Sequence, residues 1–301
     1  MNNLISLRVI SFLVLLFSVQ FTSLASFANA ANSHSKDAST LPFGSQHAIV
    51  VEDGTGRILL EKNSKDIVPI ASLTKLMTAM VVLDSKPNMD EKISIELADV
   101  DMLKHSSSHV PVGAKLARSD VLQLALMSSD NRAAASLART YPGGTAAFAA
   151  AVKAKIKVLG MTNTVINEPT GLSPGNTSTA ADLIKMAVAA SRYPEIADIT
   201  TDQSDLIKIN GRNVNFHNTN RLVGSKGWDI LLSKTGFTNE AGNCLIMRFK
   251  LAGKKATLVL LNARASSSRF LDALNIRRFL AKHPDAQPVV MSAEAIVPPL
   301  R

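Results

Sequence analysis

Residues 69–83 begin Pro69-Ile70-Ala71-Ser72-Leu73-Thr74-Lys75 and continue with apolar residues at helical spacing. The apolar positions are Leu73, Leu76, Met77, Met80 and Leu83. This pattern predicts a largely buried helix with Ser72 at or near its first turn. Because residues three apart share one face of a helix, Lys75 can reach the Ser72 hydroxyl and act on it as a base. Free N–H groups at the start of the helix can also stabilise a developing oxyanion.

A Ser-x-x-Lys spacing alone is weak, and a second copy runs from Ser33 to Lys36 in a polar stretch. No helix is predicted after that second copy. Taken alone, Ser72 could be a helix cap and Lys75 a solvated lysine. The interpretation as a catalytic pair therefore depends on two further motifs.

The second motif is Ser129-Asp130-Asn131, which interrupts two apolar helical runs and is the only Ser-x-Asn in the chain. A polar triplet between helices is commonly a turn or a cap. As chemistry, the Ser129 hydroxyl can pass a proton to a leaving amine, while the Asn131 amide can hold a substrate carbonyl.

The third motif is Lys234-Thr235-Gly236, at the end of a predicted apolar strand. A lysine charge near the Ser-x-x-Lys pair would favour a neutral Lys75 by like-charge repulsion. Thr235 could bind a carboxylate, and Gly236 lacks the Cβ that would block a substrate along the strand edge. The N–H of Phe237 could complete an oxyanion hole with that of the serine at the helix start.

Five segments predict β-strands separated by short turns, and four segments besides the helix after Ser72 predict helices. The strands are 48–51, 57–60, 229–235, 243–249 and 256–262, and the helices are 119–137, 146–159, 179–191 and 269–280. Asn210-Gly211 marks the tip of a further hairpin. The predicted fold class is α+β, with a five-stranded antiparallel sheet covered by helices and an inserted, mostly helical lobe at about 90–200.

In this order the three motifs match the signature of active-site serine enzymes that act on D-alanyl peptides and β-lactams. The chain resembles the low-molecular-weight penicillin-binding proteins, which are serine D-alanyl-D-alanine carboxypeptidases and endopeptidases. It is most similar to the endopeptidase branch that includes penicillin-binding protein 7. The stretches that carry this likeness are 127–134, 141–144, 168–172 and 234–242.

The resemblance extends from about Ala48 to Leu280 and implies the β-lactamase/transpeptidase-like fold without a cofactor. It implies roles for eight residues of this chain. Those implied as catalytic are Ser72, Lys75 and Ser129, and those implied as substrate-binding are Asn131, Lys234, Thr235, Gly236 and Phe237.

The first thirty residues are expected to be a signal peptide. Arg8 is their only charge, the apolar run 9–17 is short for a membrane span, and Ala28-Asn29-Ala30 predicts cleavage before Ala31. An uncleaved anchor is the alternative. We expect a linker at 31–45, a peptidase domain at 46–283 and a proline-containing tail at 284–301. The resemblance then implies a periplasmic enzyme without a stable membrane anchor, because the C-terminal β-domain and anchoring helix of longer relatives are expected to be absent.

Composition restricts the partners. The formal net charge is +9, and it falls to +8 without Arg8. A basic exported protein is attracted to anionic envelope polymers, although a basic surface with no specific partner is an equal alternative. Nucleic acid is not expected, because no basic run is interleaved with aromatic residues and Trp228 is the only tryptophan. Cys244 is the only cysteine, so no intramolecular disulfide can form.

Four other polar residues were candidates for chemistry. His105 and His109 are four apart, but the serines between them predict a loop, and no metal site is expected. Glu168 could be compared with the deacylating glutamate of class A β-lactamases, although its surroundings favour a structural place in a loop. Arg264 could meet a substrate carboxylate or be a solvated arginine at a strand end.

Three functions therefore compete. The first is a serine peptidase that acts on peptidoglycan stem peptides through a Ser72 acyl-enzyme and is inhibited by β-lactams. It would open D-Ala–meso-diaminopimelate cross-links as an endopeptidase or, alternatively, trim terminal D-Ala from monomeric pentapeptides. The second is a class A-like β-lactamase, against which the absence of a Glu-x-x-x-Asn loop argues. The third is a β-lactam sensor, against which the intact set of Lys75, Ser129 and Lys234 argues.

Overall fold

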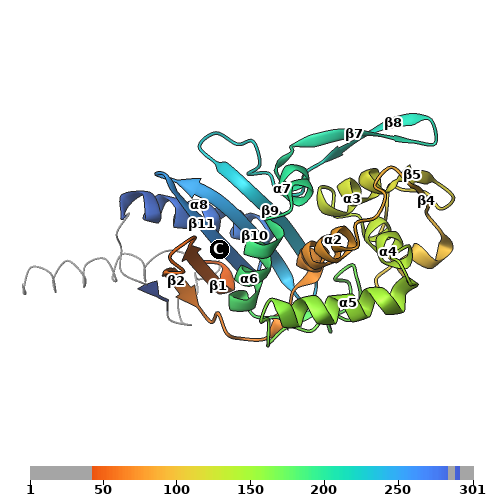
Figure 1. The fold of residues 1–301 in the computed structure, drawn as a ribbon. Helices are drawn as coiled ribbons and strands as arrows, with labels where there is room; N and C mark the ends of the chain where they lie inside the picture. Colours follow the sequence, from red (N-terminus) through yellow and green to blue (C-terminus); the bar gives the residue numbers. More distant parts are fainter. Residues whose placement is uncertain (1–42, 284–288, 292–301) are drawn as a thin grey trace, which may run out of the picture.

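A six-stranded sheet forms the centre of the computed structural model, which describes residues 43–283 and 289–291 of the 301-residue chain (Figure 1). In spatial order the strands are β12 (Val289–Val290), β2 (Ile58–Lys62), β1 (Ser45–Glu52), β11 (Lys254–Ala263), β10 (Gly242–Leu251) and β9 (Asp229–Thr238). All neighbours are antiparallel except β12, which pairs parallel with β2. The predicted α+β class with five antiparallel strands is confirmed.

The sixth strand, β12, corrects the strand count. It lies in the segment that was expected to be an irregular tail, where Val289 pairs with Leu60 of β2. Two paired residues are too short for an alternating pattern, so the sequence carried no periodic signal for this strand.

The sheet buries both faces. Ile49, Ile246 and Val259 belong to one core, which they share with α2 (Thr74–Asp84) and α6 (Ala180–Ala190). Their neighbours in sequence, such as Val50, Leu245 and Leu258, belong to a second core against α8 (Ser266–Lys282). Because side chains alternate along a strand, the sheet is covered by helices on both sides and its long strands read as nearly continuous apolar runs.

The remaining elements lie between β2 and β9 in the sequence. The helices are η1 (Ala71–Leu73), η2 (Leu97–Asp99), α3 (Arg118–Leu126), α4 (Asn131–Arg139), α5 (Gly144–Val158) and α7 (Pro194–Thr201). Three small antiparallel pairs join β3 (Val68–Pro69) to β6 (Thr177–Ser178), β4 (Lys92–Ser94) to β5 (Lys115–Ala117) and β7 (Ser204–Ile209) to β8 (Arg212–His217). Figure 1 shows α3, α4 and α5 around α2, to one side of the sheet.

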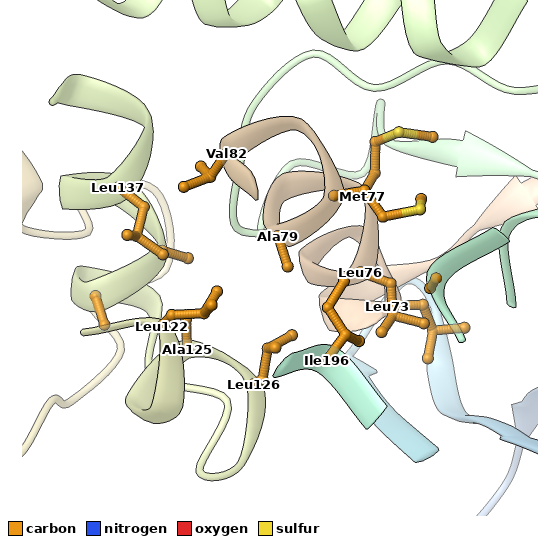
Figure 2. Close-up of a cluster of buried hydrophobic side chains, with 14 of the residues drawn as sticks. Leu73, Leu76, Met77, Ala79, Val82, Leu122, Ala125, Leu126, Leu137 and Ile196 are labelled. Atoms are coloured by element: carbon orange, nitrogen blue, oxygen red, sulfur yellow. The ribbon is translucent and has the colours of Figure 1, made fainter. Parts of the chain in front are cut away.

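Helix α2 is the centre of this helical region, and every residue from Thr74 to Val82 is buried. Figure 2 shows Leu76 and Ala79 on α2 beside apolar side chains of α3 and beside Ile196 of α7. Each fully buried Leu or Met side chain stabilises the fold by about 1.5–3 kcal/mol relative to the same side chain left exposed to water. The packing therefore fixes the start of α2, and with it the 3₁₀ turn that carries Ser72.

Within residues 43–283 and 289–291, no helix combines the length and apolar character needed to cross a membrane. The predicted signal peptide, its cleavage site before Ala31 and the Ser33–Lys36 pair lie outside the described residues. The predicted boundaries of the linker, the peptidase domain and the tail remain predictions.

The loop 167–176 lies directly against the turn that carries Ser72. Gly171 has a φ of +86°, and a Cβ built on it would lie 1.9 Å from the Ala71 carbonyl oxygen and 2.8 Å from the Ser72 nitrogen. Only glycine allows this backbone to approach so closely, because it lacks the Cβ and tolerates a positive φ.

We predict that Gly171→Ala destabilises the fold and displaces Ser72. A positive φ costs a non-glycine residue about 1–2 kcal/mol, and overpacking adds about 1–3 kcal/mol. Gly54→Ala is the matched control, because Gly54 has a φ of +87° with nothing within 4 Å of its Cβ position. Urea unfolding should show a larger loss in the free energy of unfolding for Gly171→Ala than for Gly54→Ala. Penicillin should also acylate the Gly171→Ala variant more slowly. Equal losses of stability for the two variants would show that the close approach of Gly171 to the Ser72 turn does not contribute to stability.

Candidate active site

Ser72 and Lys75 are in contact at the start of α2. The Lys75 Nζ lies 2.9 Å from the Ser72 Oγ. Ala71, immediately before the serine, has a φ of +47°, which is uncommon for a residue other than glycine. Strained backbone of this kind is concentrated at functional sites. The predicted one-turn spacing of Ser72 and Lys75 thus places the hydroxyl and the amine within hydrogen-bond distance.

Lys75 is 1% exposed and has two further partners. Its Nζ donates to the Asn131 Oδ1 at 2.6 Å and to the Thr170 carbonyl oxygen at 2.7 Å. Burial lowers the pKa of Lys75 to about 7, although Glu168, Asp130 and Asp101 act in the opposite direction. Asn131 Oδ1 and the Thr170 carbonyl can only accept hydrogen bonds, whereas a serine hydroxyl can donate. A neutral Lys75 therefore has its lone pair free for the Ser72 proton.

Glu168 builds the loop that supplies the Thr170 carbonyl. Its carboxylate accepts hydrogen bonds from the Thr170 N–H at 2.7 Å, the Gly171 N–H at 2.6 Å and the Asn176 Nδ2 at 3.0 Å. The hydroxyl of Thr170 donates to the same carboxylate. Glu168 thus has the structural place in the loop that its sequence context favoured.

The Ser129-Asp130-Asn131 motif lies between α3 and α4. The Asp130 Oδ1 caps α4 by accepting from the Ala133 N–H at 2.9 Å, and Ser129 has a φ of +60°. Besides accepting from Lys75, Asn131 donates from its Nδ2 to the Ser106 Oγ at 2.9 Å. The motif therefore forms the turn and cap that the sequence allowed, and it also brings Asn131 to Lys75.

Lys234 reaches Ser129 from β9. Its Nζ donates to the Ser129 Oγ at 2.8 Å and to the Thr235 carbonyl at 3.0 Å, and the residue is 1% exposed. Burial and the nearby charge of Lys75 both lower the pKa of Lys234. For Lys75 itself, burial is the first cause of the shift. Desolvation, rather than the like-charge repulsion that the sequence suggested, thus lowers the pKa of Lys75.

Thr235, Gly236 and Phe237 continue along β9, the edge strand nearest α2. The Thr235 hydroxyl is hydrogen-bonded to the Thr219 Oγ1 at 2.6 Å, and the Phe237 side chain is 58% exposed. A Cβ on Gly236 would lie 3.1 Å from the Ile70 carbonyl and 3.2 Å from the Ser72 nitrogen. A side chain at this position would press against the turn that carries Ser72, so the glycine favours close packing of β9 on that turn. The clearance for a substrate that was expected from the sequence stays a prediction.

Three other polar candidates lie at the surface. Arg264 is exposed just after β11, and His105 and His109 are exposed in the loop before β5. Among the described residues, no group of three or more His, Cys, Asp or Glu could hold a metal ion. Cys244 is buried, and burial raises the pKa of its thiol to about 11.

Three residues near the site had no signal in the sequence. Ser106 holds the Asn131 amide, Thr219 holds the Thr235 hydroxyl, and Arg269 of α8 donates from its Nη1 to the Gly236 and Cys244 carbonyls at 2.9 and 3.0 Å. Each is a common polar residue far in sequence from the three motifs. Only the folded chain brings them to the site.

The model of the D-alanyl-D-alanine carboxypeptidase family, peptidase S11, matches residues 33–265. The chain belongs to this family. It is 48% identical to a D-alanyl-D-alanine endopeptidase of Pseudomonas aeruginosa over 77% of this chain and 76% of that protein. It is 42% identical to the endopeptidase of that name from Escherichia coli over 89% of this chain and 88% of that one. These relatives confirm the resemblance to the endopeptidase branch.

A solved structure supports the fold. Penicillin-binding protein D2 of Listeria monocytogenes, in its cefotaxime-bound form, superposes with a TM-score of 0.68 at 28% identity. The match covers 79% of this chain and 98% of that one.

We predict that Lys75→Ala stops acylation of Ser72 by penicillin and that Lys75→Arg restores little of it. An arginine stays protonated and cannot accept the serine proton, and loss of general-base catalysis costs about 10²–10⁴-fold. Intact mass measured against time follows the acylation, and peptide mapping places the label on Ser72 rather than Ser33.

Lys153→Ala, which removes an exposed lysine of α5, is the control and should acylate at the wild-type rate. Near-normal acylation of the Lys75→Arg variant would show that Lys75 supplies only positive charge. Label that survives in Ser72→Ala would overturn the choice of nucleophile.

Proposed function

We propose that this protein is a serine D-alanyl-D-alanine endopeptidase that opens D-Ala–meso-diaminopimelate cross-links of peptidoglycan through a Ser72 acyl-enzyme. The observation that carries the proposal is the position of the buried Lys75 amine. Two of its three partners can only accept hydrogen bonds, so its lone pair is available to the Ser72 hydroxyl. Two relatives with 48% and 42% identity are named D-alanyl-D-alanine endopeptidase, which supports the choice of bond.

In the first step, Lys75 takes the proton from Ser72 as its Oγ attacks the carbonyl carbon of the D-alanyl bond. The N–H groups of Ser72 and Phe237 stabilise the oxyanion. When the C–N bond breaks, the Ser129 hydroxyl gives a proton to the leaving amine, and Lys234 beside it can replace that proton. Before the second step, Lys75 releases to solvent the proton taken from Ser72, and Lys234 regains one from solvent. The neutral Lys75 then takes a proton from a water molecule that attacks the ester carbonyl, and returns it to the Ser72 Oγ as the ester C–O bond breaks.

The substrate would lie along the free edge of β9, as an added strand beside Thr235 and Phe237. Lys234 and Thr235 lie next to Ser129 at the leaving-group side, where they can receive a carboxylate. A carboxylate at this position raises the pKa of Lys234, because an opposite charge favours the ammonium form. Asn131 would orient the acyl-donor peptide.

A β-lactam would acylate the same serine, since its ring carbonyl presents the same electrophile. The Listeria relative is described with cefotaxime bound, which supports inhibition of this protein by β-lactams. A β-lactamase is disfavoured because the Glu168 carboxylate already accepts hydrogen bonds from its own loop and is not free to activate water. A long-lived penicilloyl-enzyme is therefore expected.

The cellular setting belongs to the same proposal. We place the enzyme in the periplasm after cleavage before Ala31, with the peptidase domain at 46–283. Its partners would be peptidoglycan stem peptides, to which the basic surface adds a salt-sensitive attraction.

We predict that the mature enzyme opens a purified cross-linked dimer with a higher kcat/KM than it shows for release of D-Ala from a monomeric pentapeptide. A large amine leaving group gains contacts along the β9 edge in the transition state that free D-Ala cannot make. Product masses against time give both constants, and Ser72→Ala is the inactive control.

A tenfold preference for the monomer, which corresponds to about 1.4 kcal/mol of transition-state stabilisation, would make the protein a carboxypeptidase. Acylation without cleavage of either peptide would instead indicate a sensor.

A further inference from the structure

An ion pair joins two distant segments of the chain just beyond the C-terminal end of β9. The Lys104 Nζ is bonded to the Glu240 Oε1, although the two residues are 136 positions apart. Lys104 lies in the loop between η2 and β5, and Glu240 lies in the turn between β9 and β10. Their side chains are 33% and 38% exposed, so a ligand can reach both charges.

The position of Glu240 relative to β9 indicates on which side of the scissile bond the ion pair lies. Along this strand, Lys234 contacts Ser129, and Gly236 packs against the Ser72 nitrogen. Glu240 follows two residues after the end of β9, beyond Ser72 and away from Ser129. Because Ser129 serves the leaving amine in the proposed mechanism, Lys104 and Glu240 lie on the acyl-donor side.

The loop that carries Lys104 is anchored to the site. The Asp101 carboxylate accepts hydrogen bonds from the N–H groups of Leu103 and Lys104 at 2.8 and 3.0 Å, and from that of Ser106 at 2.8 Å. Ser106 in turn accepts from the Asn131 amide. The Lys104 backbone therefore has a defined position relative to the Ser72–Lys75 pair.

We propose that Lys104 and Glu240 select the acyl-donor stem peptide by exchanging their ion pair for the zwitterionic end of a diaminopimelate side chain. This inference rests on the proposed endopeptidase function. The free end of that side chain carries an ammonium and a carboxylate on one carbon. The ammonium pairs with Glu240 and the carboxylate pairs with Lys104. A donor with lysine at the same position presents an ammonium alone.

The preference for a diaminopimelate donor over a lysine donor should be moderate. The ion pairs with the ligand replace the existing Lys104–Glu240 pair and remain partly exposed. The two donors differ by one partly exposed ion pair, that of the carboxylate with Lys104. The expected preference for the diaminopimelate donor is therefore about fivefold in kcat/KM, which corresponds to about 1 kcal/mol. Added salt should reduce it.

Two synthetic cross-linked dimers test the proposal. They share one meso-diaminopimelate acceptor and differ only in the donor stem, which contains meso-diaminopimelate or L-lysine before D-Ala. For the wild type, the first dimer should be cleaved about fivefold more efficiently. For Lys104→Met, the ratio should fall to about one, because the carboxylate loses its partner. For Glu240→Gln, cleavage of both dimers should fall, because both donors carry the ammonium.

Asp229→Asn is the matched control. Asp229 pairs with Lys250 at 3.5 Å at the opposite end of β9 and β10, and both side chains are exposed. This variant should keep the wild-type ratio. Acylation by benzylpenicillin, which lacks the donor residue, should be the same in all four proteins and reports an intact site.

The outcomes separate the two proposals. Equal cleavage of both dimers by the wild type, or an unchanged ratio in Lys104→Met, overturns the donor selection and leaves the endopeptidase function intact. Acylation by benzylpenicillin without cleavage of either dimer overturns the endopeptidase function, and the donor selection with it.

Discussion

The position of the Lys75 amine is the constraint on which the rest of the structure depends. Its three partners come from separate segments: Ser72 from η1, Asn131 from the start of α4 and the carbonyl of Thr170 from a loop. Each segment has its own support, including the Asp130 cap of α4 and the Glu168 carboxylate within the loop. Two helices and a loop therefore converge on one buried nitrogen, and burial lowers its pKa to about 7.

Building this site lowers the stability of the fold, and the apolar packing around it offsets that loss. Ala71 and Ser129 have φ values of +47° and +60°, and strained backbone costs about 1–3 kcal/mol per residue. The buried ammonium groups of Lys75 and Lys234 add desolvation, which their lowered pKa values reflect. Against this, α2 buries Leu76, Met77 and Met80 completely, each worth about 1.5–3 kcal/mol. The apolar surface that makes α2 a helix also holds the strained turn before it.

The sequence predicted the parts of this arrangement that depend on local patterns. Helical spacing after Ser72 predicted α2, and short apolar runs separated by turns predicted the antiparallel sheet, because both patterns lie within a few neighbouring residues. The two-residue strand β12 has no such pattern. The sequence also did not predict Ser106, Thr219 and Arg269 as parts of the site. Their contacts with Asn131, Thr235 and Gly236 join residues 16 to 33 positions apart. The sequence also did not predict the close approach of Gly236 to the Ser72 turn, because residues 72 and 236 meet only in the folded chain.

The most direct test of this account is the pKa of Lys75 in the free enzyme, measured by NMR titration of ¹⁵N-lysine-labelled protein. The Lys75 Nζ signal is assigned as the one that disappears in Lys75→Arg, and the Lys234 signal is assigned in the same way. We predict a Lys75 pKa of about 7, so that the neutral fraction and the rate of acylation rise together with pH and level off above it. A Lys75 pKa near the ordinary value of 10.5 would contradict the account, because the amine would then be protonated at neutral pH and could not take the Ser72 proton.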